Sequence, residues 1–137
     1  MRPHLLIPLV VFTVLISTSV RAEKDGHSND EECGRLRGML EINLCAGEKF
    51  HEADSELNEL YAQKLNLTKT KASKDRLRNA QRAWIAFRDK VCLYEAGPEK
   101  ESGSIWQFHQ FGCMEFYTRT RIEDFKLYLR CTTDDCP

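Results

Sequence analysis

The stretch NAQRAWIAFRDKVC, from Asn79 to Cys92, combines aromatic, charged and thiol side chains more densely than any other part of the chain. Its apolar residues recur at intervals of three and four, which is the spacing of one face of an α-helix. Ser73 has the side chain of a helix N-cap. We therefore predict a helix from Ser73 to Cys92, with the cysteine at its end. Its inward stripe is Leu77, Ala80, Gln81, Trp84, Phe87, Arg88 and Val91.

Two other segments show the same helical periodicity. The first covers about residues 44–65, and the last runs from about Ser104 to Arg130, where Gly112 predicts a kink or a split. Between the second and third helices, residues 95–103 contain Gly97-Pro98 and predict a loop. No segment alternates like a strand. The sequence therefore predicts an all-α fold, a small bundle of three to four helices stapled by disulfides.

The N-terminus has the features of an export signal. Arg2 precedes an uncharged, mainly apolar run from Leu5 to Val20, and Val20-Arg21-Ala22 fits a signal peptidase site. We predict a signal peptide over residues 1–22, cleaved after Ala22, and a flexible leader over residues 23–32. The apolar run is shorter than the roughly 20 residues of a membrane span, so we expect no stable anchor after cleavage. Retention of the segment as an anchor is the alternative.

Cleavage would make the chain more acidic. Loss of Arg2 and Arg21 takes Lys plus Arg from 20 to 18 while Asp plus Glu stays at 21, so the net charge moves from −1 to about −3. Proteins that bind nucleic acid in general carry a basic stripe instead. The charge therefore argues against a nucleic-acid partner.

The cysteines predict cross-links. An even number in a small exported domain indicates disulfides. No C-x-x-C occurs and the histidines are scattered, so disulfides are favoured over a metal site, and we expect no cofactor. The sequence alone does not select a pairing. The cysteines are Cys33, Cys45, Cys92, Cys113, Cys131 and Cys136.

No catalytic residue emerges from the sequence. The chain lacks the G-x-S-x-G motif, and export disfavours the free thiol that a Cys–His pair needs. We interpret Asp54 and Arg88 as polar groups that hydrogen-bond between the first and second helices. The aromatics near the last helix start cannot all face one stripe. Some either form a partner-binding edge or cover the second helix; these residues are Trp106, Phe108, Phe111 and Phe116.

Four motifs, in order with the first four cysteines, resemble the lysozyme inhibitor LprI-like family of exported bacterial proteins. They are ADSELNELY (53–61), AQRAWIAFRDKVC (80–92), SGSI (102–105) and TRTR (118–121). The resemblance implies a small helical, disulfide-bonded domain, here residues 33–130, that binds and inhibits lysozyme. The chain lacks the lipid-attachment cysteine of the family's namesake. The matching motif residues are Asp54, Asn58, Tyr61, Gln81, Arg82, Trp84, Phe87, Arg88, Asp89 and Arg121.

Chain order within this framework suggests a disulfide pairing. Cys33–Cys45 would tie the leader to the first helix, and Cys92–Cys113 would close the connection between the second and third helices. Cys131–Cys136 would close a C-terminal tail over residues 131–137, which is additional to the family's four-cysteine core.

These features predict an exported binding protein, without enzymatic activity, that blocks a lysozyme-type muramidase. The alternative is a module for another envelope protein or a peptidoglycan fragment. An inhibitor needs a rigid surface that occludes a cleft. We predict the segment 95–106 as that surface, with acidic residues facing a basic enzyme and small residues entering a groove, although a solvated connector is the other interpretation. The candidate contacts are Glu95, Glu99, Glu101, Ser102, Gly103, Ser104 and Trp106.

Overall fold

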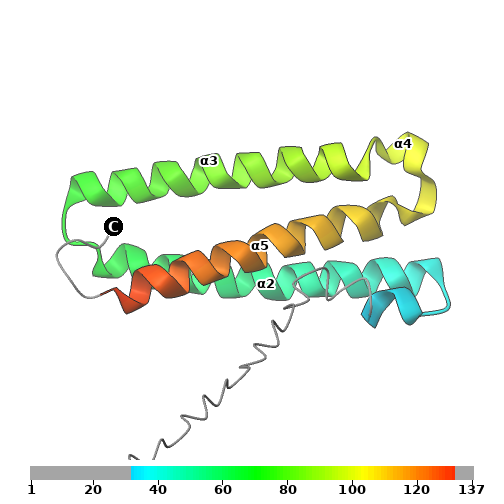
Figure 1. Cartoon of the computed structure of the whole chain (residues 1–137), viewed down its shortest axis with the longest axis horizontal. Coiled ribbons are helices and arrows are strands. Elements are labelled where there is room, and N and C mark those ends of the chain that lie inside the picture. The colour runs from blue at the N-terminus through cyan, green and yellow to red at the C-terminus, as the bar shows by residue number, and fades with distance from the viewer. Residues whose placement is uncertain (1–31, 132–137) are drawn as a thin grey trace, which may run out of the picture.

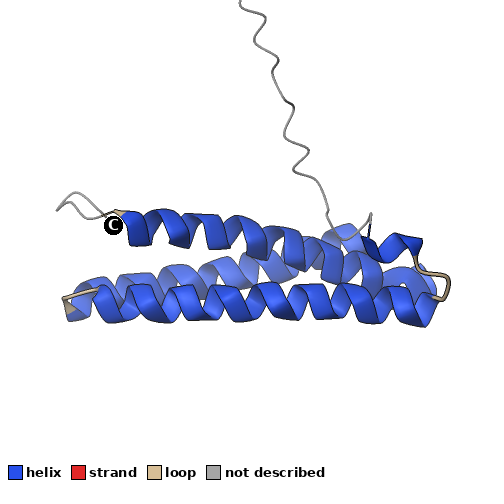
Figure 2. Ribbon diagram, turned by 90° about the horizontal axis from the view of Figure 1, so that it is seen from below, coloured by secondary structure: helices blue, strands red, loops and turns tan. Residues whose placement is uncertain are grey.

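The computed structural model describes residues 32–131. Every regular element in this range is helical (Figure 2), so the predicted all-α class is confirmed. The expectations for the signal peptide, for the leader before Glu32 and for the tail after Cys131 lie outside the described residues. The elements are η1 (Cys33–Arg35), α2 (Met39–Leu67), α3 (Lys71–Ala96), α4 (Glu99–Ser102), η2 (Gly103–Ile105) and α5 (Trp106–Arg130).

The three long helices lie lengthwise against one another. Residues 68–70 join α2 to α3 in a tight turn, so α3 runs antiparallel to α2. The short elements α4 and η2 turn the chain again at the other end, and α5 therefore runs in the same direction as α2 (Figure 1). We call α4, η2 and residues 97–98 the connector. Within residues 32–131, none of the helices combines the length and apolar character that crossing a bilayer requires.

The first two long helices start at other residues than the sequence predicts. Helix α2 begins at Met39, before the predicted start at residue 44. The N-cap of α3 is Thr70 rather than Ser73, because the Thr70 hydroxyl accepts a hydrogen bond from the Ser73 backbone N–H at 3.1 Å. A side-chain oxygen at this position satisfies a backbone donor that has no partner inside the helix.

The predicted loop at residues 95–103 is wrong for most of its length. Helix α3 continues to Ala96, one turn beyond Cys92, and one turn of α4 follows. Gly97 (φ 70°) and Gly103 (φ 67°) adopt the left-handed backbone region that favours glycine, and they mark the two changes of direction.

Gly112 does not split α5 in two, so that part of the prediction is wrong. Helix α5 is continuous from Trp106 to Arg130 with Gly112 buried inside it. A glycine in a helix interior costs about 1 kcal/mol relative to alanine, which is too little to end a helix that packs along its length. The start at Trp106 rather than Ser104 follows from the 3₁₀ turn of η2.

The apolar core lies mainly between α2 and α5. One cluster near the middle of the helices contains Ala53, Leu57, Ile122 and Phe125, with Trp84 and Leu77 of α3 packed against it. A second cluster near the connector end joins Cys33, Ala46 and Phe108. The second cluster places Phe108 against α2, so this aromatic does not cover α3.

Helix α3 fully buries two polar side chains and two small apolar ones. Its buried residues are Gln81, Arg88, Cys92 and Ala96, and none of these is a large aliphatic side chain. The predicted core position of Phe87 is wrong, since this residue is 52% exposed. Arg88, the next residue, occupies the inward face, and Phe87 lies edge-on to Tyr117 with 5.5 Å between ring centroids. Trp84 and Leu77, both half-buried, supply the large apolar side chains with which α3 packs on the core cluster.

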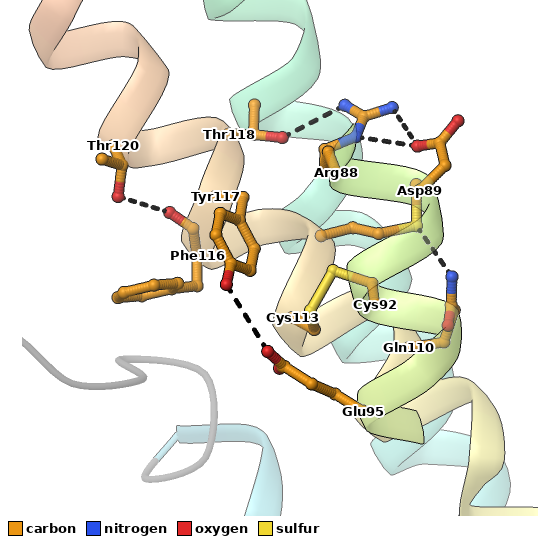
Figure 3. The surroundings of a disulfide bond; sticks show 11 residues. Arg88, Asp89, Cys92, Glu95, Gln110, Cys113, Phe116, Tyr117, Thr118 and Thr120 are labelled. Carbon is orange, nitrogen blue, oxygen red and sulfur yellow. Dashed lines mark hydrogen bonds and ion pairs between the residues drawn. A yellow bond between two sulfur atoms is a disulfide. The ribbon is translucent and has the colours of Figure 1, made fainter. Parts of the chain in front are cut away.

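Two of the suggested disulfides are confirmed. Cys33 pairs with Cys45, and Cys92 pairs with Cys113. Cys33 and Cys92 are fully buried. The Cys92–Cys113 bond joins α3 to α5 just before the connector (Figure 3). The pairing of Cys131 with Cys136 stays a prediction, because Cys136 lies outside the described residues.

The Cys92–Cys113 disulfide is expected to stabilise the fold. A double Cys92→Ser, Cys113→Ser variant should lower the free energy of unfolding by about 2–4 kcal/mol, because a cross-link restricts the unfolded chain. Urea unfolding followed by far-ultraviolet circular dichroism measures the change. A midpoint equal to that of the wild type would show that polar contacts and Trp84 hold α3 without the covalent bond.

Candidate functional site

The buried guanidinium of Arg88 connects all three long helices. Its Nη1 donates to Asp54 Oδ1 of α2 at 3.0 Å and to Thr118 Oγ1 of α5 at 3.2 Å. Its Nε and Nη2 each lie 3.0 Å from Asp89 Oδ1 on the same helix (Figure 3). The Arg88 side chain is 7% exposed, whereas those of Asp54 and Asp89 are 36% and 50% exposed. The expected hydrogen bond between Asp54 and Arg88 is therefore present.

Two arginines enclose Trp84. The Arg88 guanidinium carbon lies 5.3 Å from the Trp84 ring centroid and 5.2 Å from that of Phe50. The Arg121 guanidinium carbon lies 5.8 Å from Trp84 and 5.0 Å from Phe125. These distances are within the range of cation–π attraction. We call these five residues the arginine–aromatic stack. It brings together cations and rings from all three long helices.

Hydrogen bonds orient the second arginine. Arg121 Nε donates to the side-chain oxygen of the buried Gln81 at 3.3 Å, which links α5 to α3. Arg121 Nη1 donates to Asp124 Oδ2 at 3.1 Å, one turn further along its own helix. Gln81, which the sequence places on the inward stripe of its helix, is buried and makes this contact.

The remaining motif residues divide into two groups. Asn58 donates to the second carboxylate oxygen of Asp54 at 3.0 Å, and Tyr61 lies edge-on to Phe125 at 6.0 Å. These two residues support the network from α2. Arg82 is exposed and donates only to Asn79 on its own helix.

Hydrogen bonds from side chains within the connector and from neighbouring helices hold the connector in place. The Trp106 indole N–H donates to the Gly97 carbonyl at 2.8 Å, and Asn43 of α2 donates to the Ser104 carbonyl at 2.8 Å. Ser102 Oγ lies 2.8 Å from the Ala96 carbonyl oxygen and donates there. Among the predicted contact residues, Trp106 and Ser102 therefore have structural bonds of their own.

The acidic residues of the connector region face solvent. Glu95, Glu99 and Glu101 are all exposed, as is Lys100 between the last two. The Tyr117 hydroxyl donates to Glu95 Oε1 at 3.5 Å (Figure 3). Gly103 and Ser104 are exposed as well. The structure thus gathers the predicted contacts at one end of the bundle.

Sequence reasoning missed three polar residues that the structure uses. Thr118 is fully buried and accepts from Arg88, and Asn43 anchors the connector from 61 residues away. Glu115 is 3% exposed and accepts from Arg119 Nε at 2.6 Å. Thr118 is the first residue of the TRTR motif (118–121), and this motif is the sequence signal that could have identified it. The sequence gives no sign of the Asn43 contact, because it depends on where two distant segments meet.

A family model described as "Lysozyme inhibitor LprI" matches residues 33–125, more than half of the chain. The chain belongs to this family. Its LprI region begins at the first described cysteine and contains the whole Arg88 network. An uncharacterized protein of Rhizobium meliloti is 29% identical over 119 residues, covering 77% of this chain and 84% of that protein. No solved structure matches.

The LprI motif residues therefore mostly serve the interior. Contacts within and between helices link Asp54, Gln81, Trp84, Arg88 and Arg121. The residues that match the family motifs thus mainly determine how the three helices pack.

The Arg88 network predicts a specific pattern of stability loss. Arg88→Ala should lower the free energy of unfolding by about 2–4 kcal/mol, because buried Thr118 loses its partner and Asp54 loses its countercharge. Arg82→Ala, an exposed change on the same helix, should change it by about 0.5 kcal/mol or less. Thermal unfolding of the two variants provides the comparison. Equal melting temperatures would contradict the central role of Arg88.

Proposed function

We propose that this chain is an exported inhibitor of a lysozyme-type muramidase. The observation that carries the proposal is the LprI match over residues 33–125. The buried disulfides support the export part, because such bonds persist in oxidising compartments outside the cytoplasm. The protein acts by binding and uses no catalytic group of its own.

The connector is the proposed contact surface. Its supports are the Cys92–Cys113 bond and the hydrogen bonds from Trp106 and Asn43. A surface that is already ordered loses little conformational entropy when it binds, so more of the contact energy appears as affinity.

Charge gives the connector a preferred partner. Glu95, Glu99 and Glu101 project from one end of the molecule into solvent, and Lys100 offsets part of their charge. Acidic side chains on a rim attract a basic enzyme surface and raise the association rate. The neighbouring Gly103 and Ser104 have little bulk and allow close approach to a groove.

A cell-wall lysis assay tests the inhibition. The purified mature protein should slow the clearing of bacterial walls by a chicken-type, goose-type or invertebrate-type lysozyme. The Glu95→Gln, Glu99→Gln, Glu101→Gln variant should raise the inhibitor concentration needed for half-inhibition about tenfold, because each exposed ion pair contributes about 0.5 kcal/mol. The difference should shrink in high salt, where exposed charges are screened.

A matched variant controls for net charge. Glu52→Gln, Glu59→Gln, Glu123→Gln removes the same number of exposed carboxylates away from the connector and should inhibit like the wild type. If both triple variants inhibited lysozyme equally weakly, the connector would not be the contact surface. If the protein left the rate of lysis unchanged with all three lysozyme types, the inhibitor proposal would be wrong and another envelope partner would be favoured.

Export predicts a defined mature N-terminus. When the full chain is expressed in a bacterium with a working secretion system, the released protein should begin at Glu23, since cleavage is expected after Ala22. Intact mass measurement of the periplasmic or culture fraction gives the position. A chain that keeps residues 1–22 and fractionates with membranes would instead indicate a retained anchor.

A further inference from the structure

A cavity lies at the end of the bundle away from the connector. It is formed where α2 ends, α3 begins and α5 nears its end, and its volume is ≈ 330 Å³. Small-molecule sites in proteins have volumes of about 300–1,000 Å³. The cavity is therefore large enough for a compact ligand but not for a folded partner.

The lining is cationic. Of the eight lining residues, three are Lys or Arg, namely Lys64, Arg76 and Arg121, and none is Asp or Glu. The whole chain has a net charge of −1, so this concentration of positive charge departs from the average surface. A pocket lined by one sign of charge attracts ligands of the opposite sign.

Nearby carboxylates neutralise only part of this charge. Asp124 pairs with Arg121 at 3.1 Å. Asp75, beside Arg76 in sequence, is engaged by Lys71 and Arg78 instead, and the hydrogen bond from Lys71 lowers its pKa. Neither Lys64 nor Arg76 forms an ion pair with a carboxylate of the described residues.

The two uncompensated cations keep donors for a ligand. Lys64 Nζ uses one of its three protons on the Tyr128 carbonyl at 3.0 Å. Arg76 Nη2 donates to the Ser73 hydroxyl at 2.9 Å, which leaves most of its five N–H groups without a described partner. An anion placed between them would receive charge-assisted hydrogen bonds, which are stronger than neutral ones.

The rest of the wall is largely apolar. Leu77 and Ala80 of α3 and Tyr128 of α5 line the cavity, and Leu77 and Tyr128 also pack on the core cluster of α2 and α5. An inorganic ion would leave these walls in contact with water. A ligand that has an anionic head and an apolar body satisfies both parts of the lining.

We propose that this cavity is a binding site for a small organic carboxylate with an apolar body. Lys64 and Arg76 hold the carboxylate, Leu77 and Tyr128 contact the body, and Arg121 transmits occupancy to Trp84 through the arginine–aromatic stack. The site lies at the opposite end from the connector, so it does not depend on lysozyme inhibition.

Benzoate is the test ligand, and benzamide is its neutral match in shape. In ¹H–¹⁵N spectra of the purified protein, benzoate should shift the indole N–H signal of Trp84 with a dissociation constant of about 1 mM, as expected for so small a ligand. Benzamide and inorganic sulfate should each bind at least about tenfold more weakly. The Trp106 signal, assigned through Trp106→Phe, should not move, because Trp106 lies at the connector.

Matched variants locate the site. Lys64→Gln, Arg76→Gln should weaken benzoate binding at least about tenfold, while Lys69→Gln, Arg82→Gln, which makes the same charge change at exposed positions outside the lining, should bind like the wild type. Arg76→Gln alone should weaken binding about threefold to fivefold and should not disturb the fold, since Arg76 is exposed and its described hydrogen bond stays within α3.

Three results would overturn the proposal. They are equal binding of benzoate and benzamide, wild-type affinity in the Lys64→Gln, Arg76→Gln variant, or a benzoate-dependent shift of Trp106 in place of Trp84. None of these results depends on the lysis assay, so the ligand proposal and the lysozyme proposal are tested separately.

Discussion

The bundle depends on one buried cation that has to be satisfied by partners on other helices. A guanidinium removed from water is tolerated only when its hydrogen bonds and charge are matched. Arg88 finds Asp54 on α2, Thr118 on α5 and Asp89 on its own helix. Sliding α3 by one residue would rotate Arg88 away from these groups and leave buried polar atoms unpaired. The network thus sets the register of α3. Apolar contacts alone would specify this register less strictly, because they are non-directional.

The two ends of the molecule are held by different means. At the connector end, both described disulfides and the bonds from Trp106 and Asn43 limit movement. At the other end, α3 meets its neighbours through Leu77, the Arg121 contacts and a cavity. Under the two proposals, the connector end contacts a protein partner and the other end holds a small solute. Trp84, which contacts both Arg88 and Arg121, lies between these two ends of the bundle.

Much of the architecture follows from local sequence, because apolar spacing of three and four residues is a property of each helix by itself. The Asp54–Arg88 contact was also accessible, since a charged residue on an inward stripe requires a partner. Phe87 differs from the prediction because it lies about 100° around the helix from Arg88, and the guanidinium rather than the ring occupies the inward position. Gly97-Pro98 predicts a loop because this pair breaks a helix, yet residues 99–105 form helical turns, with Ser102 bonded to Ala96 of α3 and Trp106 bonded to Gly97. Neither the cavity nor the Asn43 anchor has a local signature, because both arise from distant segments.

The interior position of the family motif has a consequence for how such proteins diversify. Residues that pair inside the bundle are interdependent, so exchanging one of them requires compensation by another. The exposed glutamates of the connector have few structural partners and can change singly without loss of the fold. A chain that keeps Arg88, Trp84 and their partners keeps this packing, while its exposed residues can change. The interior motif residues therefore fix the architecture, and they do not by themselves determine what the protein binds.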